Sequence, residues 1–165
     1  MHSFRQHELL AADEPPAFER FELGHRLPVV VACDHASRRI PRALEQLGLP
    51  EAALQRHIAW DIGAAEVARE LARRLEVTAV LANYSRLVID CNRHIEDSTS
   101  IVSESDGQVV PGNANLSQAA RQLRARACFW PYHEALEAAL HALINGPRVP
   151  ALIAIHSFTP SMNGQ

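Results

Sequence analysis

The sequence lacks several features that mark specialised classes of protein. Its three cysteines, Cys33, Cys91 and Cys128, are odd in number and far apart, so they form neither a disulfide framework nor a CxxC metal site. No apolar run approaches the roughly 18 residues needed to span a bilayer. The polar stretch from Met1 to Glu22 also lacks the apolar centre of a signal peptide. We therefore expect a soluble cytoplasmic protein with no membrane partner.

Features of nucleic-acid and nucleotide binding are also missing. The chain has 16 lysines and arginines against 19 aspartates and glutamates, for a formal net charge of -3. A general nucleic-acid binder is usually basic. Neither a P-loop nor a GxGxxG sequence occurs, so nucleotide binding has no support either. We expect no nucleic-acid partner.

What the sequence contains is typical of one globular domain. The chain has 165 residues, of which 47% are hydrophobic and 21% charged, which is enough to bury a core without disulfides. Residues 1–26, interrupted by Pro15-Pro16, are expected to form an irregular arm. A single domain is expected over residues 27–165.

Short apolar runs alternate with helical patterns along this domain. The runs 27–32, 77–82, 87–89 and 151–155 predict buried strands. Helices are predicted over 41–47, directly after Pro50, over 61–75 with Asp61 as N-cap, and over 117–144 with Ser117 as cap and a break near Pro131. This alternation predicts an α/β fold whose central sheet, mostly parallel or mixed, is flanked by helices.

Two predicted strands lead directly to a histidine. The first ends near His35 and the last near His156. Because the carboxyl ends of parallel strands meet at one edge of a sheet, we expect both imidazoles at that edge. Imidazole is the commonest metal ligand, and a carboxylate from Asp34 or Asp61 would complete a three-ligand zinc site. The alternative is that these are unrelated polar loop residues.

Two arginines, Arg86 and Arg93, flank the predicted strand 87–89. Guanidinium groups bind carboxylates through two parallel hydrogen bonds, which suits an anionic substrate or a developing oxyanion. The alternative is structural, with Arg93 paired to Asp90 or Asp97.

Two other constellations are weaker. His133, Glu137 and His141 share the spacing of one helix face, but such polar patterns usually mark a solvated surface. Cys33 and His35 could be a nucleophile and its base, yet a buried small residue is the favoured interpretation of this cysteine.

Four segments, taken together and in this order, resemble the N-formylglutamate amidohydrolase family. The similarity covers about residues 25–160. The segments are Val31-Ala32-Cys33-Asp34-His35-Ala36-Ser37 with Ile40-Pro41, His57-Ile58-Ala59-Trp60-Asp61-Ile62-Gly63-Ala64, Ser85-Arg86-Leu87-Val88-Ile89-Asp90-Cys91-Asn92-Arg93, and Ile155-His156-Ser157-Phe158-Thr159-Pro160.

The resemblance implies a fold like that of the zinc carboxypeptidases and aspartoacylases. It also implies hydrolysis of the amide bond of a small anionic N-acyl amino acid, with zinc or another divalent metal as cofactor. His35 and His156 would be metal ligands, with Asp61 as the expected third. The carboxypeptidase-like pattern has a glutamate three residues after the first histidine, where this chain has Arg38.

The same resemblance implies roles for four further residues. Asn92 and Arg93 resemble the pair that grips the substrate carboxylate, and Arg86 resembles the arginine that polarises the scissile carbonyl. Ser157 is expected to contact the substrate.

Members of this family usually continue well beyond the last segment, and the resemblance implies a general base beyond Gln165. We therefore expect a C-terminally truncated fold with an exposed strand edge near Leu152 and Ile153, which would favour a homo-oligomer. The alternative function is a non-catalytic module, derived from this fold, that binds a small anion or a metal.

Overall fold

The centre of the protein is a mixed sheet of four strands. A computed structural model describes residues 9–24, 26–144, 146 and 148–159. The strand order is β1 (Phe18–Phe21), β3 (Thr78–Ala82), β2 (Val29–Cys33) and β6 (Ala151–Ala154). β2 runs parallel to both β3 and β6, whereas β1 is antiparallel to β3. Together with the helices, this sheet confirms the predicted α/β fold.

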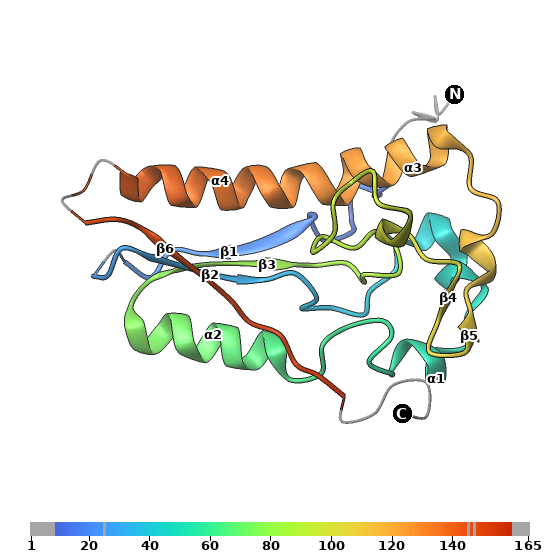
Figure 1. The fold of residues 1–165 in the computed structure, drawn as a ribbon, viewed down its shortest axis with the longest axis horizontal. Coiled ribbons are helices and arrows are strands. Elements are labelled where there is room, and N and C mark those ends of the chain that lie inside the picture. The colour runs from blue at the N-terminus through green and yellow to red at the C-terminus, as the bar shows by residue number, and fades with distance from the viewer. Residues whose placement is uncertain (1–8, 25, 145, 147, 160–165) are drawn as a thin grey trace.

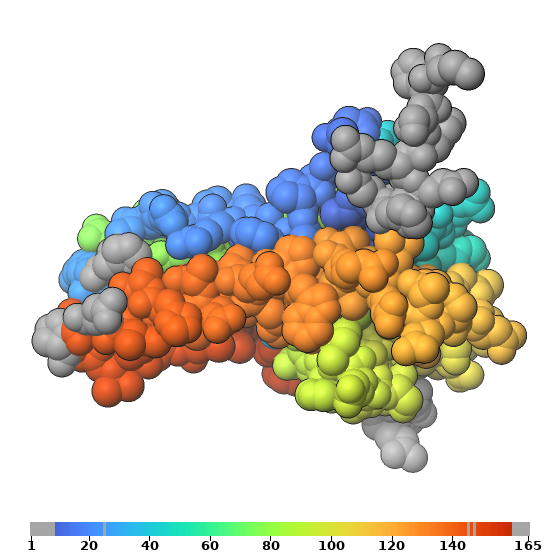
Figure 2. Space-filling view, turned by 90° about the horizontal axis from the view of Figure 1, so that it is seen from above, coloured from blue at the N-terminus to red at the C-terminus, as the bar shows by residue number. Residues whose placement is uncertain are grey.

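Helices cover both faces of the sheet (Figure 1). α2 (Ala64–Leu75) lies on one face and α4 (Trp130–Ile144) on the other. Figure 2 shows the molecule from the α4 side, where α3 (Gln118–Arg124) and α4 form a continuous band. No helix in the described part of the chain is long and apolar enough to cross a bilayer.

Several short elements lie beyond the carboxyl ends of β2 and β6, the strands that lead to His35 and His156. They are the 3-10 segments η1 (Arg42–Gly48), η2 (Ser98–Ser100) and η3 (Pro111–Asn113), the helix α1 (Glu51–Leu54), and the hairpin of β4 (Glu104–Ser105) and β5 (Gln108–Val109).

Burial on both faces explains why the central strands are continuous apolar runs. In β2, Val30 and Ala32 pack in the core on the α4 side, whereas Val31 and Cys33 pack in the core on the α2 side. Successive side chains of a strand point to opposite faces, so a strand covered on both sides needs apolar residues at every position.

Three local predictions are wrong. Part of the arm expected to be irregular forms β1, which adds an antiparallel strand to the sheet. Residues 87–89 form no strand: Leu87 and Val88 lie in a turn, in which the Val88 N–H donates to the Ser85 carbonyl at 2.9 Å, and Ile89 follows it. The N-cap of α2 is Gly63, with φ 81°, and not Asp61, whose side chain is used elsewhere.

The predicted helix over 117–144 is interrupted as expected. The Ser117 side chain accepts a hydrogen bond from the Ala120 N–H and so caps α3. A π-helical turn, η4 (Ala125–Phe129), then separates α3 from α4. It lies just before Pro131, which has no N–H to donate and whose ring crowds the carbonyl four residues earlier.

Candidate metal centre

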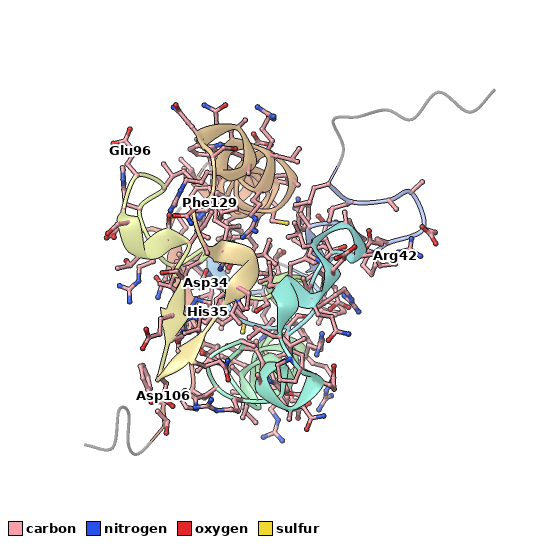
Figure 3. All side chains as sticks on the ribbon, turned by 90° about the vertical axis from the view of Figure 1, so that its right-hand side faces the viewer. Asp34, His35, Arg42, Glu96, Asp106 and Phe129 are labelled. Atoms are coloured by element: carbon pink, nitrogen blue, oxygen red, sulfur yellow. The ribbon has the colours of Figure 1, made fainter. Side chains whose placement is uncertain are left out.

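The two strand-end histidines lie side by side. β2 and β6 are neighbours, with Ala32 opposite Ala154, and the chain continues from both into the histidine segments. The imidazole ring centroids of His35 and His156 are 5.2 Å apart. Figure 3 shows His35, next to Asp34, in the middle of the molecule at this end of the sheet. The sheet edge therefore brings together two imidazoles that are far apart in the sequence.

Asp61 reaches the same point from the segment before α2. Its N–H donates to the His35 carbonyl at 3.0 Å, which fixes the backbone beside the histidine. Its Oδ2 lies 3.4 Å from His35 Nδ1 and 2.9 Å from His156 Nδ1. The single oxygen Asp61 Oδ2 thus faces the Nδ1 atom of each histidine.

These three residues fit a zinc ion. Their donor atoms all lie within 4.8 Å of one another, and no other group of His, Cys, Asp or Glu in the described residues meets this condition. Two imidazoles and a carboxylate are the donor set of many catalytic zinc sites. The site is also sheltered, because His35 is 2% and Asp61 5% exposed.

Each imidazole has a second carboxylate at its other nitrogen. His35 Nε2 is 2.7 Å from Asp90 Oδ1, and His156 Nε2 is 3.2 Å from Asp34 Oδ2. Proteins commonly orient metal-ligating histidines through such an outer carboxylate. The sequence suggested Asp90 only as a partner of Arg93, and nothing in its spacing predicts the contact with His35.

Further groups hold both outer carboxylates. The Arg86 guanidinium donates to Asp90 Oδ2 at 2.8 Å, and the Asn92 N–H donates to Asp90 Oδ1 at 2.8 Å. The Tyr132 hydroxyl donates to Asp34 Oδ1 at 2.6 Å. Asp90 is thus held mainly by a cation and Asp34 by a neutral phenol.

The hydrogen bonds within the site decide its protonation. Burial alone would lower the pKa of His35, but hydrogen bonds to Asp61 and Asp90 outweigh it and raise that pKa above its ordinary value. Burial alone would raise the pKa of Asp61 and of Asp90. Hydrogen bonds from His35, and for Asp61 also from His156, lower both below the ordinary value. Without metal, the site therefore favours a charged imidazole between two carboxylates.

A cavity of about 340 Å³ adjoins the site. Arg86, Asp90 and Arg93 are among its lining residues, so both arginines face one cavity. Arg86 also lies 3.7 Å from Asp61 Oδ1. Arg86, rather than Arg93, forms the ion pair with Asp90, which leaves the exposed Arg93 facing the cavity.

Ser157 and Asn92, the other two residues predicted to contact the substrate, contact the site through their backbone N–H groups. The Ser157 N–H donates to Asp61 Oδ2 at 3.3 Å. The N–H of Asn92 binds Asp90, and the residue as a whole is exposed.

The weaker constellations do not form a second site. Cys33 is fully buried, and burial followed by the charge of Asp34 raises its pKa to about 12, so it is no nucleophile. His133 Nε2 lies 3.0 Å from the Cys91 carbonyl, whereas His141 forms an exposed contact of 3.5 Å with Glu137.

Comparison with known proteins identifies the family. A family profile described as N-formylglutamate amidohydrolase matches residues 27–165. The chain belongs to the N-formylglutamate amidohydrolase family. The crystal structure of a gene product from Agrobacterium tumefaciens is similar, with 34% identity and a TM-score of 0.91. The similarity covers 96% of this chain and 63% of that one, and no curated protein matches significantly. The resemblance inferred from the four sequence segments is thus confirmed.

Proposed function

We propose that the protein is a zinc-dependent amidohydrolase that removes the acyl group from a small anionic N-acyl amino acid, such as N-formylglutamate. Family membership supports the reaction class. The observation that carries the proposal is the convergence of His35, Asp61 and His156 beside a cavity lined by Arg86 and Arg93. A cytoplasmic location and a homo-oligomeric state stay predictions.

His35, Asp61 and His156 would hold zinc or another divalent metal. When bound, zinc acts as a Lewis acid that polarises a carbonyl oxygen and lowers the pKa of water to about 7. Asp61 supplies a negative charge among the ligands, because its lowered pKa keeps the carboxylate ionised.

The two arginines have different tasks in this proposal. Arg93, exposed on the cavity wall, binds a substrate carboxylate through its planar fork of donors. Arg86 is fixed by Asp90 and lies beside Asp61, so its positive charge faces the place where the acyl oxygen gains negative charge. Asn92 and Ser157 would complete the contacts with the substrate.

The substitution Arg93→Lys tests the carboxylate site. An ammonium group cannot reproduce two parallel hydrogen bonds, so we expect the KM for N-formylglutamate to rise about tenfold with little change in kcat. Arg126→Lys, at an exposed position on η4, is the control and should leave both constants unchanged.

The reaction itself is tested by formate release from N-formylglutamate. In a chain that also carries the expected general base, we expect release that depends on zinc, stops on treatment with a chelator and is lost in His156→Ala. A protein that binds both zinc and N-formylglutamate but releases no formate would instead be the non-catalytic binding module. A protein that binds neither would contradict both functions.

A further inference from the structure

A buried tyrosine connects α4 to the end of β2. The hydroxyl of Tyr132, on α4, donates to Asp34 Oδ1 at 2.6 Å across 98 positions of sequence. Tyr132 is fully buried, and Asp34 is only 8% exposed. The contact is a polar link beside the cluster of apolar core side chains to which Tyr132 belongs.

The helix is irregular where it presents this tyrosine. The π-helical turn Ala125–Phe129 ends three residues before Tyr132, and Pro131 lies between them. A π turn shifts the faces of the helix that follows, and such turns occur frequently at functional sites. The irregular backbone precedes the one residue of α4 whose side chain bonds to the polar residue beside His35.

The other oxygen of Asp34 faces His156. Asp34 Oδ2 lies 3.2 Å from His156 Nε2, while His156 Nδ1 faces Asp61 Oδ2 at 2.9 Å. A neutral imidazole carries one proton, so an acceptor at Nε2 leaves the lone pair on Nδ1. With one oxygen held by Tyr132, the carboxylate keeps its second oxygen toward the histidine.

We propose that Tyr132 is a positioning residue for the metal centre: it fixes Asp34, which accepts a hydrogen bond from the Nε2–H of His156 and leaves the Nδ1 lone pair free for the metal. This inference rests on the proposed function. His156 needs such support because it follows β6 at the edge of the sheet, and its side chain is 18% exposed against 3% for His35.

The experiment compares the zinc dissociation constants of Tyr132→Phe and Tyr84→Phe, measured by competition with a chelator. Tyr84 is the matched control, because it is 3% exposed and its hydroxyl donates to the Pro15 carbonyl at 2.7 Å, outside the site. Each variant loses one hydrogen bond made by the hydroxyl of a buried tyrosine. We expect only Tyr132→Phe to weaken zinc binding, by about tenfold.

Asp34→Asn provides a second test that does not depend on the packing of Tyr132. It too should weaken zinc binding by about tenfold, and adding Tyr132→Phe to it should cost no further affinity, because both act through the same carboxylate. The absorption spectrum of bound Co²⁺ should change in both variants and stay unchanged in Tyr84→Phe.

The outcomes separate this inference from the proposed function. If the wild-type protein does not bind zinc, the proposed function fails, and the inference fails with it. If the wild-type protein binds zinc and Tyr132→Phe or Asp34→Asn binds it as tightly, only the role of Tyr132 and Asp34 is overturned.

Discussion

Protons and a metal ion compete for the imidazole of His35. Its pKa is raised in the folded, metal-free protein, because its hydrogen bonds to Asp61 and Asp90 outweigh burial. Zinc needs the neutral imidazole, so protonation opposes metal binding. Zinc affinity should therefore fall as the pH is lowered, and the fall should begin above the ordinary histidine pKa of about 6.5.

The same shifts predict how stability depends on pH. The raised pKa of His35 gives stability that is complete below its unfolded value and is lost as pH rises through the folded value. The lowered pKa values of Asp61 and Asp90 give stability that is present above their ordinary values and is lost as pH falls. The metal-free site is thus most stabilising at mildly acidic pH.

At higher pH, zinc binding should supply stability in place of that lost when His35 is deprotonated. We expect the increase in Tm on adding zinc to grow from about pH 6 to about pH 8, as measured by scanning calorimetry. An increase in Tm that is constant over this range, or larger at the acidic end, would contradict a zinc site built on His35.

At the scale of residues, the sequence was informative about which side chains meet at the candidate metal site but not about the residues that orient them. His35 and His156 were predicted to meet because both follow apolar strands. The same reasoning left Asp34 and Asp61 as alternatives for the carboxylate, and the family resemblance favoured Asp61. The contacts of Tyr132 with Asp34 and of Asp90 with His35 join positions 98 and 55 residues apart, and no local spacing predicts them.

At the scale of elements, Arg124 connects the end of α3 to η3 and to the turn 86–88, which borders the cavity. It is 2% exposed, and its guanidinium donates to the carbonyls of Val88 and Gly112 and to Asn113 Oδ1, at 3.1, 3.0 and 2.6 Å. Burial, together with the charge of Arg121, lowers its pKa to about 10, so it stays charged at neutral pH. The end of α3 thereby anchors the turn that leads to Asp90.

Arg124→Met should therefore destabilise the protein strongly. Two buried acceptors and the half-buried carbonyl of Gly112 would lose their donor, so we expect a loss of about 3 kcal/mol in the free energy of unfolding, measured by urea denaturation. The exposed Arg126→Met is the matched control and should change that free energy by less than about 0.5 kcal/mol. Equal stability of the two variants would refute the anchoring role of Arg124.

The same turn explains one wrong prediction. Leu87 and Val88 are fully buried and Ile89 is 3% exposed, which is the burial expected of a central strand. They reach the core from a turn instead, held in part by the Arg124 and Asn113 side chains. A short apolar run shows burial but not backbone geometry, whereas the longer runs of β2 and β3 were predicted correctly.

At the scale of the whole molecule, the site depends on the order of the strands. β2 lies between β3 and β6, so the segment after β6 meets the segment after β2, and α4 packs on one face against β2 and β3. Among the described residues β6 pairs only with β2, and Leu152 is 49% exposed. The exposed edge expected near Leu152 is thus present, while self-association stays a prediction.

The content of bound zinc shows whether His35, Asp61 and His156 form a metal site. After loading and exhaustive dialysis, we expect about one zinc per wild-type chain and almost none in Asp61→Asn or His156→Ala. His141→Ala, which removes an exposed imidazole paired with Glu137, should keep the wild-type content. Zinc retained at the wild-type level in Asp61→Asn and His156→Ala would contradict the assignment of these residues as ligands.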